Sequence, residues 1–371
     1  MIASTLIAAL ASEYRIWLVS PDTPERLAKN PLSSHLAGHI PFQMASHPPA
    51  KRFFTQANEL AERLHAEKVH IAHIHCGGVF GWGNRWPGPS IPEILSARGM
   101  KTVWTSHSTE LPDRAFAARH RAPWISKALS PVGRAGKGRQ ARKVETEIVV
   151  SDHNLRFVED VYPGARGHLQ RIYHSRLGDD ALRPPVPREP IFLSVGHLTY
   201  RKGQHVLAKA FLKIAEELPG WKLVIVGGDS GGDGCGKDIR DAMQAHPHGS
   251  RITLAGAHDT PVEWMERASI FLQPSLEEAL GLALQEALFA GCPSIGSRAG
   301  GIPEVIDEGE NGLLVPPGDV DALADAMLRL ARDEGLRQQM SKVARESIIR
   351  KGMNRGAMIE AHRQLYHSLL A

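Results

Sequence analysis

The chain has 371 residues, of which 42% are hydrophobic and 23% are charged, and its formal net charge is +4. This composition excludes a disordered chain, and the length suits two domains of ordinary size. No apolar run is long enough to span a membrane, and the first residues lack the basic segment of a signal peptide. Three scattered cysteines, Cys76, Cys235 and Cys292, are too few for a disulfide framework and predict a reducing cytoplasm.

The first part of the chain predicts helices that alternate with short strands. Each assignment rests on the spacing of apolar residues. The predicted elements are a helix at 2–11, a strand at 14–20, a long loop at 22–52, a helix at 53–67, strands at 69–75 and 101–105, and a strand with a turn at 148–153.

Histidines stand at the ends of two of these strands. His73 and His75 share one strand face with Cys76 beside them, so a metal site can be considered. Zinc needs three or four convergent ligands and the sequence shows no second cluster, so we expect no metal site here. His107 follows the strand at 101–105, and carboxyl ends of parallel strands line ligand sites. We therefore favour a functional role for His107 over that of a buried structural histidine.

Nine basic residues and no acidic residue lie between positions 114 and 143. Phe116, Trp124, Ile125 and Leu129 are interspersed among them. This pattern is typical of a contact with an anionic membrane surface, and equally of a solvated helix and loop. No nucleic-acid-binding motif accompanies the charge, so we expect no nucleic acid partner.

The prolines from Pro184 to Pro187 indicate a stiff linker. Beyond it, strands and helices alternate, which predicts a parallel sheet covered by helices on both faces. The predicted elements are strands at 191–198, 222–226, 252–255 and 270–272, and helices at 203–218, 237–245, 261–268, 320–333, 335–349 and 353–370.

The most informative stretch covers residues 274–306. A loop with Glu277 and Glu278 leads into an apolar helix that Gly291 ends, and a second glycine turn precedes another helix start at 302–304. Two helix N-termini at the carboxyl ends of strands offer free backbone N–H groups to an anion. Glu278 and Glu286 can accept hydrogen bonds from hydroxyls. The stretch therefore suits a ligand with a phosphate centre and sugar ends, although solvated glutamates on a helix face are the alternative.

Glu278-x7-Glu286, inside SLEEALGLALQEALFAGCP and followed by GGIPEVI and NGLLVPPGD, resembles glycosyltransferase family 4. The resemblance covers about residues 70–371. It implies the GT-B fold, an α/β architecture of two Rossmann-like domains that face each other across a cleft. It also implies transfer of a sugar from a nucleotide-sugar to a hydroxyl acceptor with retention of anomeric configuration. The family uses no metal, and the nucleotide-sugar is a substrate, so no cofactor is expected.

The same resemblance divides the chain into an acceptor-side domain at 1–183, a nucleotide-sugar-binding domain at 184–350, and a helix at 351–371 that crosses back to the first domain. The implied site residues are His107 beside the transferred sugar, Glu278 on its hydroxyls, Glu286 on the ribose hydroxyls, Lys202 on the diphosphate, and the amides near Leu280, Gly281 and Leu282 on the phosphates.

Two departures from the family pattern stand out. His197 replaces an arginine that grips the donor diphosphate in relatives, and a neutral imidazole gives no permanent charge. Arg201 could compensate from the neighbouring turn, or His197 could bind as imidazolium. The family's first strand and the glycine loop after it have no counterpart before the helix at 2–11. The N-terminal domain is therefore predicted to lack its first strand, and we expect the true start of the protein to lie upstream.

The expected partners are a nucleotide-sugar donor and a carbohydrate or lipid-linked acceptor, as in polysaccharide biosynthesis. The expected location is the cytoplasm, with a peripheral membrane contact through residues 114–143. A catalytically weak or inactive nucleotide-sugar-binding protein is the alternative, because of His197 and the missing strand. The context of Glu278 and Glu286 disfavours a sugar epimerase or a phosphorylase.

Overall fold

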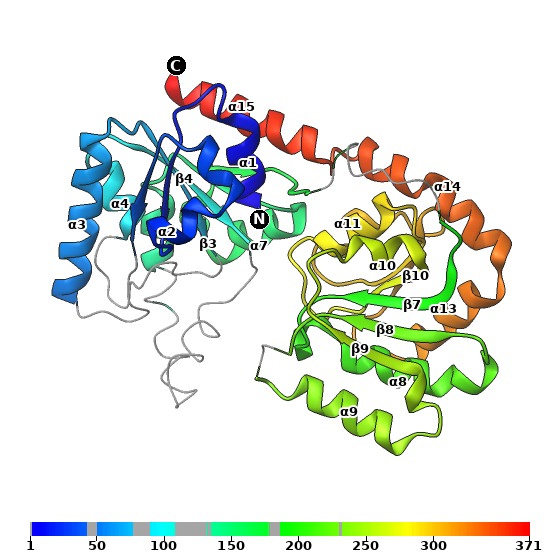
Figure 1. Cartoon of the computed structure of the whole chain (residues 1–371). Coiled ribbons are helices and arrows are strands. Elements are labelled where there is room, and N and C mark those ends of the chain that lie inside the picture. The colour runs from blue at the N-terminus through cyan, green and yellow to red at the C-terminus, as the bar shows by residue number, and fades with distance from the viewer. Residues whose placement is uncertain are drawn as a thin grey trace. The chain divides into compact units, whose positions relative to one another are not determined.

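The computed structural model describes residues 2–42, 50–76, 90–107, 131, 135–176, 178, 186–229 and 232–371. The chain divides into a first unit, Met1–Tyr173 with Gly356–Ala371, and a second unit, His174–Arg355. Each unit is built on parallel strands with helices packed against them (Figure 1). The predicted class of two Rossmann-like α/β domains is therefore confirmed.

The first unit carries two separate sheets. β3, β4, β5 and β6 form one, in that order, and β1 pairs with β2 in the other; all the described pairs are parallel. Its helices and strands are α1 Ile2–Leu10, β1 Trp17–Ser20, α2 Pro24–Ala28, η1 Pro31–His35, β2 Gly38–Pro41, α3 Ala50–Ala66, β3 Ile71–Cys76, α4 Ile91–Ser96, β4 Lys101–Ser106, β5 Thr146–Val149, α7 Asp152–Val161, η2 Pro163–Ala165, β6 Leu169–Arg171 and α15 Arg355–Leu370.

Two apolar layers hold the strands of the first unit. On one face, α1 and α15 pack together against β4 and β5, through Leu6, Leu365 and Val103 among others. On the other face, α3 and α4 form a second buried cluster that includes Leu60 and Leu95. Figure 1 shows α15 running beside α1, so the first and last helices of the chain together form the layer on this face of the sheet.

The prediction of a continuous loop at 22–52 was wrong in its described part, where α2, η1 and β2 form. Thr23 caps α2 by accepting from the Arg26 amide at 3.3 Å, and Asn30 caps η1 by accepting from the Leu32 amide at 3.0 Å. Local caps therefore shape a segment that has too few apolar residues for a periodic signal. In β2 the fully buried side chain is Ile40, and one apolar position is too little to indicate a strand.

The second unit has a six-stranded parallel sheet in the order β12-β11-β10-β7-β8-β9. Its elements are β7 Glu189–Val195, η4 Tyr200–Lys202, α8 Gln204–Ile214, η5 Ala215–Glu217, β8 Lys222–Val226, α9 Cys235–Ala245, η6 Gly249–Arg251, β9 Ile252–Gly256, α10 Val262–Arg267, β10 Ala268–Gln273, α11 Leu282–Phe289, β11 Ser294–Ser297, α12 Ile302–Val305, β12 Gly312–Val315, α13 Val320–Arg332 and α14 Glu334–Arg350. Among the described residues, no helix is long and apolar enough to cross a bilayer.

β11 and β12 are strands that the sequence pattern did not predict. β11 reads Ser-Ile-Gly-Ser and is buried throughout. Its two serines stay buried because each hydroxyl donates to a backbone carbonyl, Ser294 to Cys292 at 3.1 Å and Ser297 to Ser275. Because these buried serines are polar in the sequence, β11 cannot be recognised as a strand from the number of its apolar residues.

Candidate functional site

The candidate site of the second unit is built around a loop at the carboxyl end of β10. All six residues of β10 are buried, as expected of a central parallel strand. Pro274 follows the strand and ends it. Gly281, with a φ of 94°, is the N-cap of α11. The loop at 274–281 therefore joins a buried strand to the start of a helix, where backbone N–H groups have no partner inside the helix.

Glycines from two other elements hold this loop in place. Gly203 and Gly300 have φ values of 71° and 56°. A Cβ on Gly203 would stand 1.9 Å from the Pro274 carbonyl oxygen, and a Cβ on Gly300 would stand 1.6 Å from that of Glu278. The Gly301 amide donates to the same Glu278 carbonyl at 3.0 Å. The conformation of the loop therefore depends on backbone-to-backbone contacts that only glycine permits.

We expect Gly300→Ala to lower the free energy of unfolding by at least about 2 kcal/mol, because it combines a strained φ with a clash against the loop backbone. Urea unfolding of the purified variant measures the loss. Gly309→Ala is the matched control, since Gly309 also has a positive φ of 81° but its Cβ would meet no atom within 4 Å. Equal losses in the two variants would contradict a role for the close approach.

Glu278 lies inside this loop in a network of donors. It is 8% exposed, and its Oε2 accepts from Lys202 Nζ at 2.5 Å, Gln273 Nε2 at 3.1 Å and Ser275 Oγ at 3.2 Å. Lys202 comes from η4, directly before Gly203. The structure therefore joins the predicted pair Lys202 and Glu278, and adds Gln273 and Ser275, which the sequence analysis did not single out.

Glu286 lies on α11 and is 5% exposed. Its partner is Arg176, which forms an ion pair with Oε1. Burial raises the pKa of the Glu286 carboxyl, and the Arg176 guanidinium opposes that rise. The sequence analysis missed Arg176, because the two residues are far apart in the chain and no motif connects them. Glu286 is thus a buried carboxylate held by a cation.

The other predicted donor-binding residues surround the same loop. Arg201 is exposed, and its Nη1 donates to the Glu277 carbonyl at 3.3 Å. The positive charge of Arg201 therefore lies at the surface, beside the loop. His197 is exposed, and its carbonyl accepts from Gln204 Nε2 at 3.1 Å. The three residues at the helix start are placed as follows: Leu280 is buried at 3% exposure, Gly281 caps α11 and Leu282 begins it.

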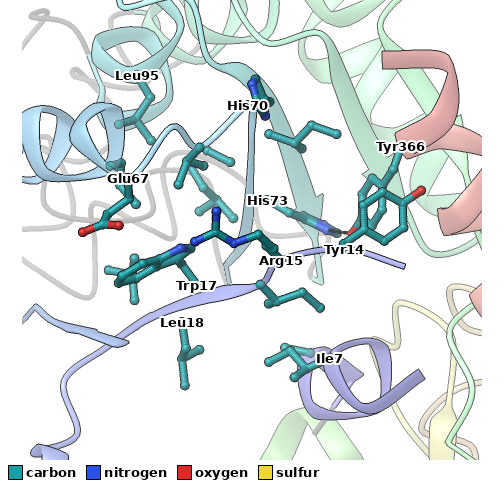
Figure 2. Close-up of a pocket in the computed structure, with 18 of the residues that line it drawn as sticks. Ile7, Tyr14, Arg15, Trp17, Leu18, Glu67, His70, His73, Leu95 and Tyr366 are labelled. Atoms are coloured by element: carbon teal, nitrogen blue, oxygen red, sulfur yellow. Dashed lines mark hydrogen bonds between the residues drawn. The ribbon is translucent and has the colours of Figure 1, made fainter. Parts of the chain in front are cut away.

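In the first unit, His107 pairs with His75. The two nitrogens His75 Nδ1 and His107 Nε2 are 3.4 Å apart, and the rings stack with centroids 5.7 Å apart. Burial and the neighbouring His107 lower the pKa of His75 to about 3, and burial lowers the pKa of His107. Because both pKa values are lowered, His75 and His107 are neutral near pH 7. The third histidine, His73, contacts Thr105 Oγ1 at 2.7 Å and the Tyr366 hydroxyl at 2.5 Å (Figure 2).

No group of three histidine, cysteine, aspartate or glutamate side chains that could hold a metal ion occurs within the described part of the chain. The contacts of His73 with Thr105 and of His75 with His107 occupy the two histidines that the sequence placed beside Cys76.

His75 should make stability depend on pH. Its pKa in the folded state lies below the unfolded value of about 6.5, so the unfolded state binds more protons between these values and stability falls on acidification through this window. The slope for this one group is at most about 1.4 kcal/mol per pH unit. Urea unfolding at pH 5 to 8 should show a shallower slope for His75→Asn than for the wild type. The control is the same measurement on His35→Asn, a substitution at an exposed histidine of η1.

Part of the basic stretch at 114–143 is internal. Lys137 is 4% exposed, and its Nζ donates to both carboxylate oxygens of Glu147, at 2.9 and 2.8 Å. Arg139 Nε donates to Glu93 Oε1 at 2.8 Å. For Lys137 both interpretations of the stretch, membrane contact and solvated surface, were wrong, whereas the Arg139 side chain is still 35% exposed. Residues 114–130 lie outside the described part of the chain.

Comparison with known proteins decides the family. The profile described as Glycosyltransferase Family 4 matches residues 2–175, and that described as Glycosyl transferases group 1 matches residues 182–347. The chain belongs to glycosyltransferase family 4. The family assignment made from Glu278, Glu286 and their flanking motifs is therefore confirmed.

The family 4 chain resembles characterised and solved relatives over different lengths. It is 31% identical to N-acetyl-alpha-D-glucosaminyl L-malate synthase of Bacillus anthracis over 182 residues, which cover 49% of this chain and 46% of that protein. It is 29% identical to D-inositol 3-phosphate glycosyltransferase of Xylanimonas cellulosilytica over 79% of this chain and 72% of that protein. A glycosyltransferase structure from Rickettsia africae matches all of this chain and 94% of its own, with a TM-score of 0.78 and 18% identity.

Proposed function

We propose that this family 4 enzyme transfers a sugar from a nucleotide-sugar to a hydroxyl group of a carbohydrate or lipid-linked acceptor, with retention of configuration. The supporting observation is the pair of buried carboxylates, Glu278 and Glu286, that bracket the start of α11, each beside a cation. A carboxylate accepts hydrogen bonds from sugar hydroxyls, and a helix start with nearby cations favours phosphate. The carbohydrate or lipid-linked acceptor is proposed because such acceptors are the commonest in the family.

In this proposal each group has one task. Glu286 accepts from the ribose hydroxyls, and Glu278 accepts from hydroxyls of the donor sugar. Lys202, Arg201 and the amides around Leu280, Gly281 and Leu282 hold the diphosphate. They stabilise the negative charge that grows on the leaving nucleotide as the bond to the sugar breaks. His197, where relatives have arginine, adds a hydrogen bond without a permanent charge.

His107 is the proposed contact to the transferred sugar or the attacking hydroxyl. Its lowered pKa keeps the imidazole neutral near pH 7, so the ring can accept or donate a hydrogen bond without bringing a charge. His75, at 3.4 Å, orients that ring. No cofactor takes part in the proposal, because the leaving nucleotide is supplied with the substrate.

A thermal-shift panel with UDP, GDP and ADP tests the donor site, because the proposed nucleotide contacts lie in the second unit. A nucleotide at 100 times its dissociation constant should add about 2.7 kcal/mol to the free energy of unfolding. A shift with one of the three supports the site and identifies the donor class. The absence of a shift with all three would contradict nucleotide binding.

The alternative function is a nucleotide-sugar-binding protein with little or no turnover, which the exposed His197 favours. The nucleotide that shifts the melting temperature identifies the donor to use. The rate at which the protein releases nucleotide from that nucleotide-sugar separates the two functions. A His197→Arg variant restores the charge that relatives have. A gain in turnover for this variant without any turnover of the wild type would favour the alternative.

A peripheral contact with an anionic membrane through residues 114–143 stays a prediction. Lys137 and Arg139 face acidic partners within the unit, so the contact would rest on residues 114–134. Flotation of the protein with phosphatidylserine vesicles, compared with an Arg119→Gln/Arg121→Gln variant, tests it. Equal flotation of both proteins, or none, would contradict it.

A further inference from the structure

One carboxylate of the second unit, that of Asp233, contacts the starts of two helices. Its Oδ2 accepts from the Tyr200 amide at 2.8 Å, and its Oδ1 accepts from the Cys235 amide at 3.0 Å. Tyr200 is the first residue of η4, and Cys235 is the first residue of α9. The N-cap residue of α9 is Gly234, which has no side chain to accept a hydrogen bond. Asp233 therefore acts as the cap of both helices.

Asp233 belongs to the glycine-rich segment after β8, and the backbone of this segment also contacts the chain that leads to η4. The Gly196 amide donates to the Val226 carbonyl at 2.9 Å, and the Leu198 amide donates to the Gly228 carbonyl at 3.0 Å. These bonds continue the ladder between β7 and β8, in which alternate residues donate to the same neighbour. The next alternate amide is that of Tyr200, and the Asp233 side chain takes the place of the backbone carbonyl there.

The side chain of Tyr200 is fixed as well. Its hydroxyl donates to Oδ2 of Asp238, in the first turn of α9, at 2.7 Å. Its ring packs edge-on against His205 of α8, with the centroids 4.9 Å apart. Tyr200 is 36% exposed and yet is held by both its backbone and its ring. The start of η4 is thus attached to the glycine-rich segment, to α9 and to α8.

η4 contacts the loop at 274–281 on its other side. The Arg201 carbonyl accepts from the Leu276 amide at 2.8 Å, and Lys202 Nζ donates to Glu278 Oε2 at 2.5 Å. η4 therefore connects the glycine-rich segment to the candidate loop. It carries Arg201 and Lys202, the two cations that the proposed function assigns to the diphosphate.

The two sides of η4 differ in what a donor does to them. Three residues make too short a helix to hold a position by themselves, so the contacts at its two sides decide where η4 lies. An ammonium group that turns to a diphosphate gives up contact with a carboxylate, so the bond between Lys202 and Glu278 weakens when the donor binds. The bond between Asp233 and the Tyr200 amide uses no group that the donor needs. The contact that keeps η4 in place in the donor complex is therefore the one with Asp233.

We propose that Asp233 is a positioning residue for the donor diphosphate. By capping η4 and α9 with one carboxylate, it fixes the backbone from which the Arg201 and Lys202 side chains extend. Asp233 acts through the Tyr200 amide and does not touch the donor, because a carboxylate beside a phosphate would repel it. The inference rests on the proposed function, which places the diphosphate on Arg201 and Lys202.

The simpler alternative is that Asp233 only stabilises the fold as a helix cap. Asp333 has that role for α14, where it accepts from the Leu336 amide at 2.8 Å. Loss of a cap alone lowers stability and leaves the affinities for different ligands in the same ratio. Loss of a positioning residue weakens the binding of a ligand with phosphates more than the binding of one without them.

The test measures the affinity of Asp233→Ala for two ligands. One is the nucleoside diphosphate selected by the thermal-shift panel, measured by calorimetry; the other is the nucleoside of the same base, followed by NMR titration. We expect the affinity for the diphosphate to fall about tenfold or more, because its charge-assisted contacts are misplaced, and the affinity for the nucleoside to fall less than about twofold. Removal of a negative charge by itself would strengthen the binding of an anion, so the expected fall is opposite to a net-charge effect.

Two further variants make the result specific. Asp233→Asn keeps the side-chain volume and one acceptor oxygen, so it should fold and lose part of the diphosphate affinity. Asp333→Ala removes an exposed capping aspartate from the start of α14 and should lower the melting temperature without changing either affinity. Equal losses for diphosphate and nucleoside in Asp233→Ala would overturn the proposal. So would a loss of diphosphate affinity in Asp333→Ala as large as that in Asp233→Ala.

A measurement without nucleotide separates this inference from the proposed function. Hydrogen exchange of the Tyr200 and Cys235 amides should become at least about tenfold faster in Asp233→Ala, and unchanged exchange at both amides would overturn the capping contact. If the wild type binds no nucleotide, the proposed function fails, and the role of Asp233 toward the diphosphate fails with it. If the wild type binds the diphosphate and both Asp233 variants bind it equally well, this inference alone fails.

Discussion

Lys202→Met should lower kcat/KM by about 10²- to 10³-fold, the effect of removing one group that stabilises developing charge on a leaving group. In the structure Lys202 Nζ stands 2.5 Å from Glu278 Oε2 at the loop before α11. In the proposed reaction its charge serves the diphosphate, so kcat should account for most of the loss. Steady-state rates with the donor identified by the thermal-shift panel measure it.

The same substitution leaves Glu278 with the neutral donors Gln273 and Ser275, so part of the activity loss could come from a distorted loop. We expect a cost of about 1–3 kcal/mol in the free energy of unfolding for this reason. The double variant Lys202→Met/Glu278→Gln removes the charge from both partners and should regain stability but not activity. Recovery of kcat/KM in the double variant would show that Lys202 acts only by holding the loop.

Lys213→Met is the matched control for charge. Lys213 also pairs with a carboxylate, Asp321, at 2.6 Å, but both side chains are exposed and lie on α8 and α13. Such a pair contributes little to stability. This variant should therefore keep wild-type activity, and a comparable loss would point to a general effect of net charge rather than to the site.

The positions of Glu278 and Glu286 around the start of α11 could be predicted because their signals are local, whereas Lys202 was expected only from the resemblance to the family. The two glutamates stand eight positions apart within a strand, loop and helix whose breakers, Pro274 and Gly291, are visible in the sequence. The helix at 302–304 and four strands of the second unit followed from glycine turns and the spacing of apolar residues. Where one segment contains its own start, stop and apolar face, sequence reasoning suffices.

Arg176, Gln273 and Ser275 could not be predicted in the same way. Arg176 meets Glu286 only after the chain has folded, and Gln273 lies at the end of a strand that otherwise reads as apolar. Lys137 was predicted to lie at the surface because it belongs to a run of basic residues, but it is buried and pairs with Glu147 inside the unit. Polar residues with distant partners carry no periodic signal, so their roles appear only when the tertiary contacts are known.

The arrangement of the sheets in the first unit is a third case. The structure places β1 and β2 in one sheet and β3 to β6 in another. What the sequence could not predict is that β1 and β3 stay apart, with helices on both faces and an open cavity between them. α1 and α15 pack with Val103 and Ile148 in one buried cluster.

Arg176→Gln should make nucleotide binding fail at a higher pH than in the wild type. Burial raises the pKa of Glu286, and Arg176 is the group that lowers it. Without the guanidinium the pKa rises further, so the carboxyl becomes protonated earlier as the pH falls. A neutral carboxyl accepts weaker hydrogen bonds from ribose hydroxyls than a carboxylate does. Affinity for the nucleotide, measured by calorimetry from pH 5 to 8, should therefore fall on acidification in both proteins, beginning at higher pH in the variant.

Glu286→Gln is the control that assigns the effect to this carboxyl. The variant lacks the carboxylate acceptor, so at pH 8 its affinity for the nucleotide should be about 10-fold or more below that of the wild type. The amide gains no proton between pH 5 and 8, so the part of the pH dependence that comes from position 286 should disappear. If Arg176→Gln and the wild type lose affinity at the same pH, the guanidinium does not control the titration. If Glu286→Gln binds nucleotide as tightly as the wild type at pH 8, the ribose contact lies elsewhere. The two variants together therefore separate a carboxylate that binds the ribose from one that only anchors Arg176.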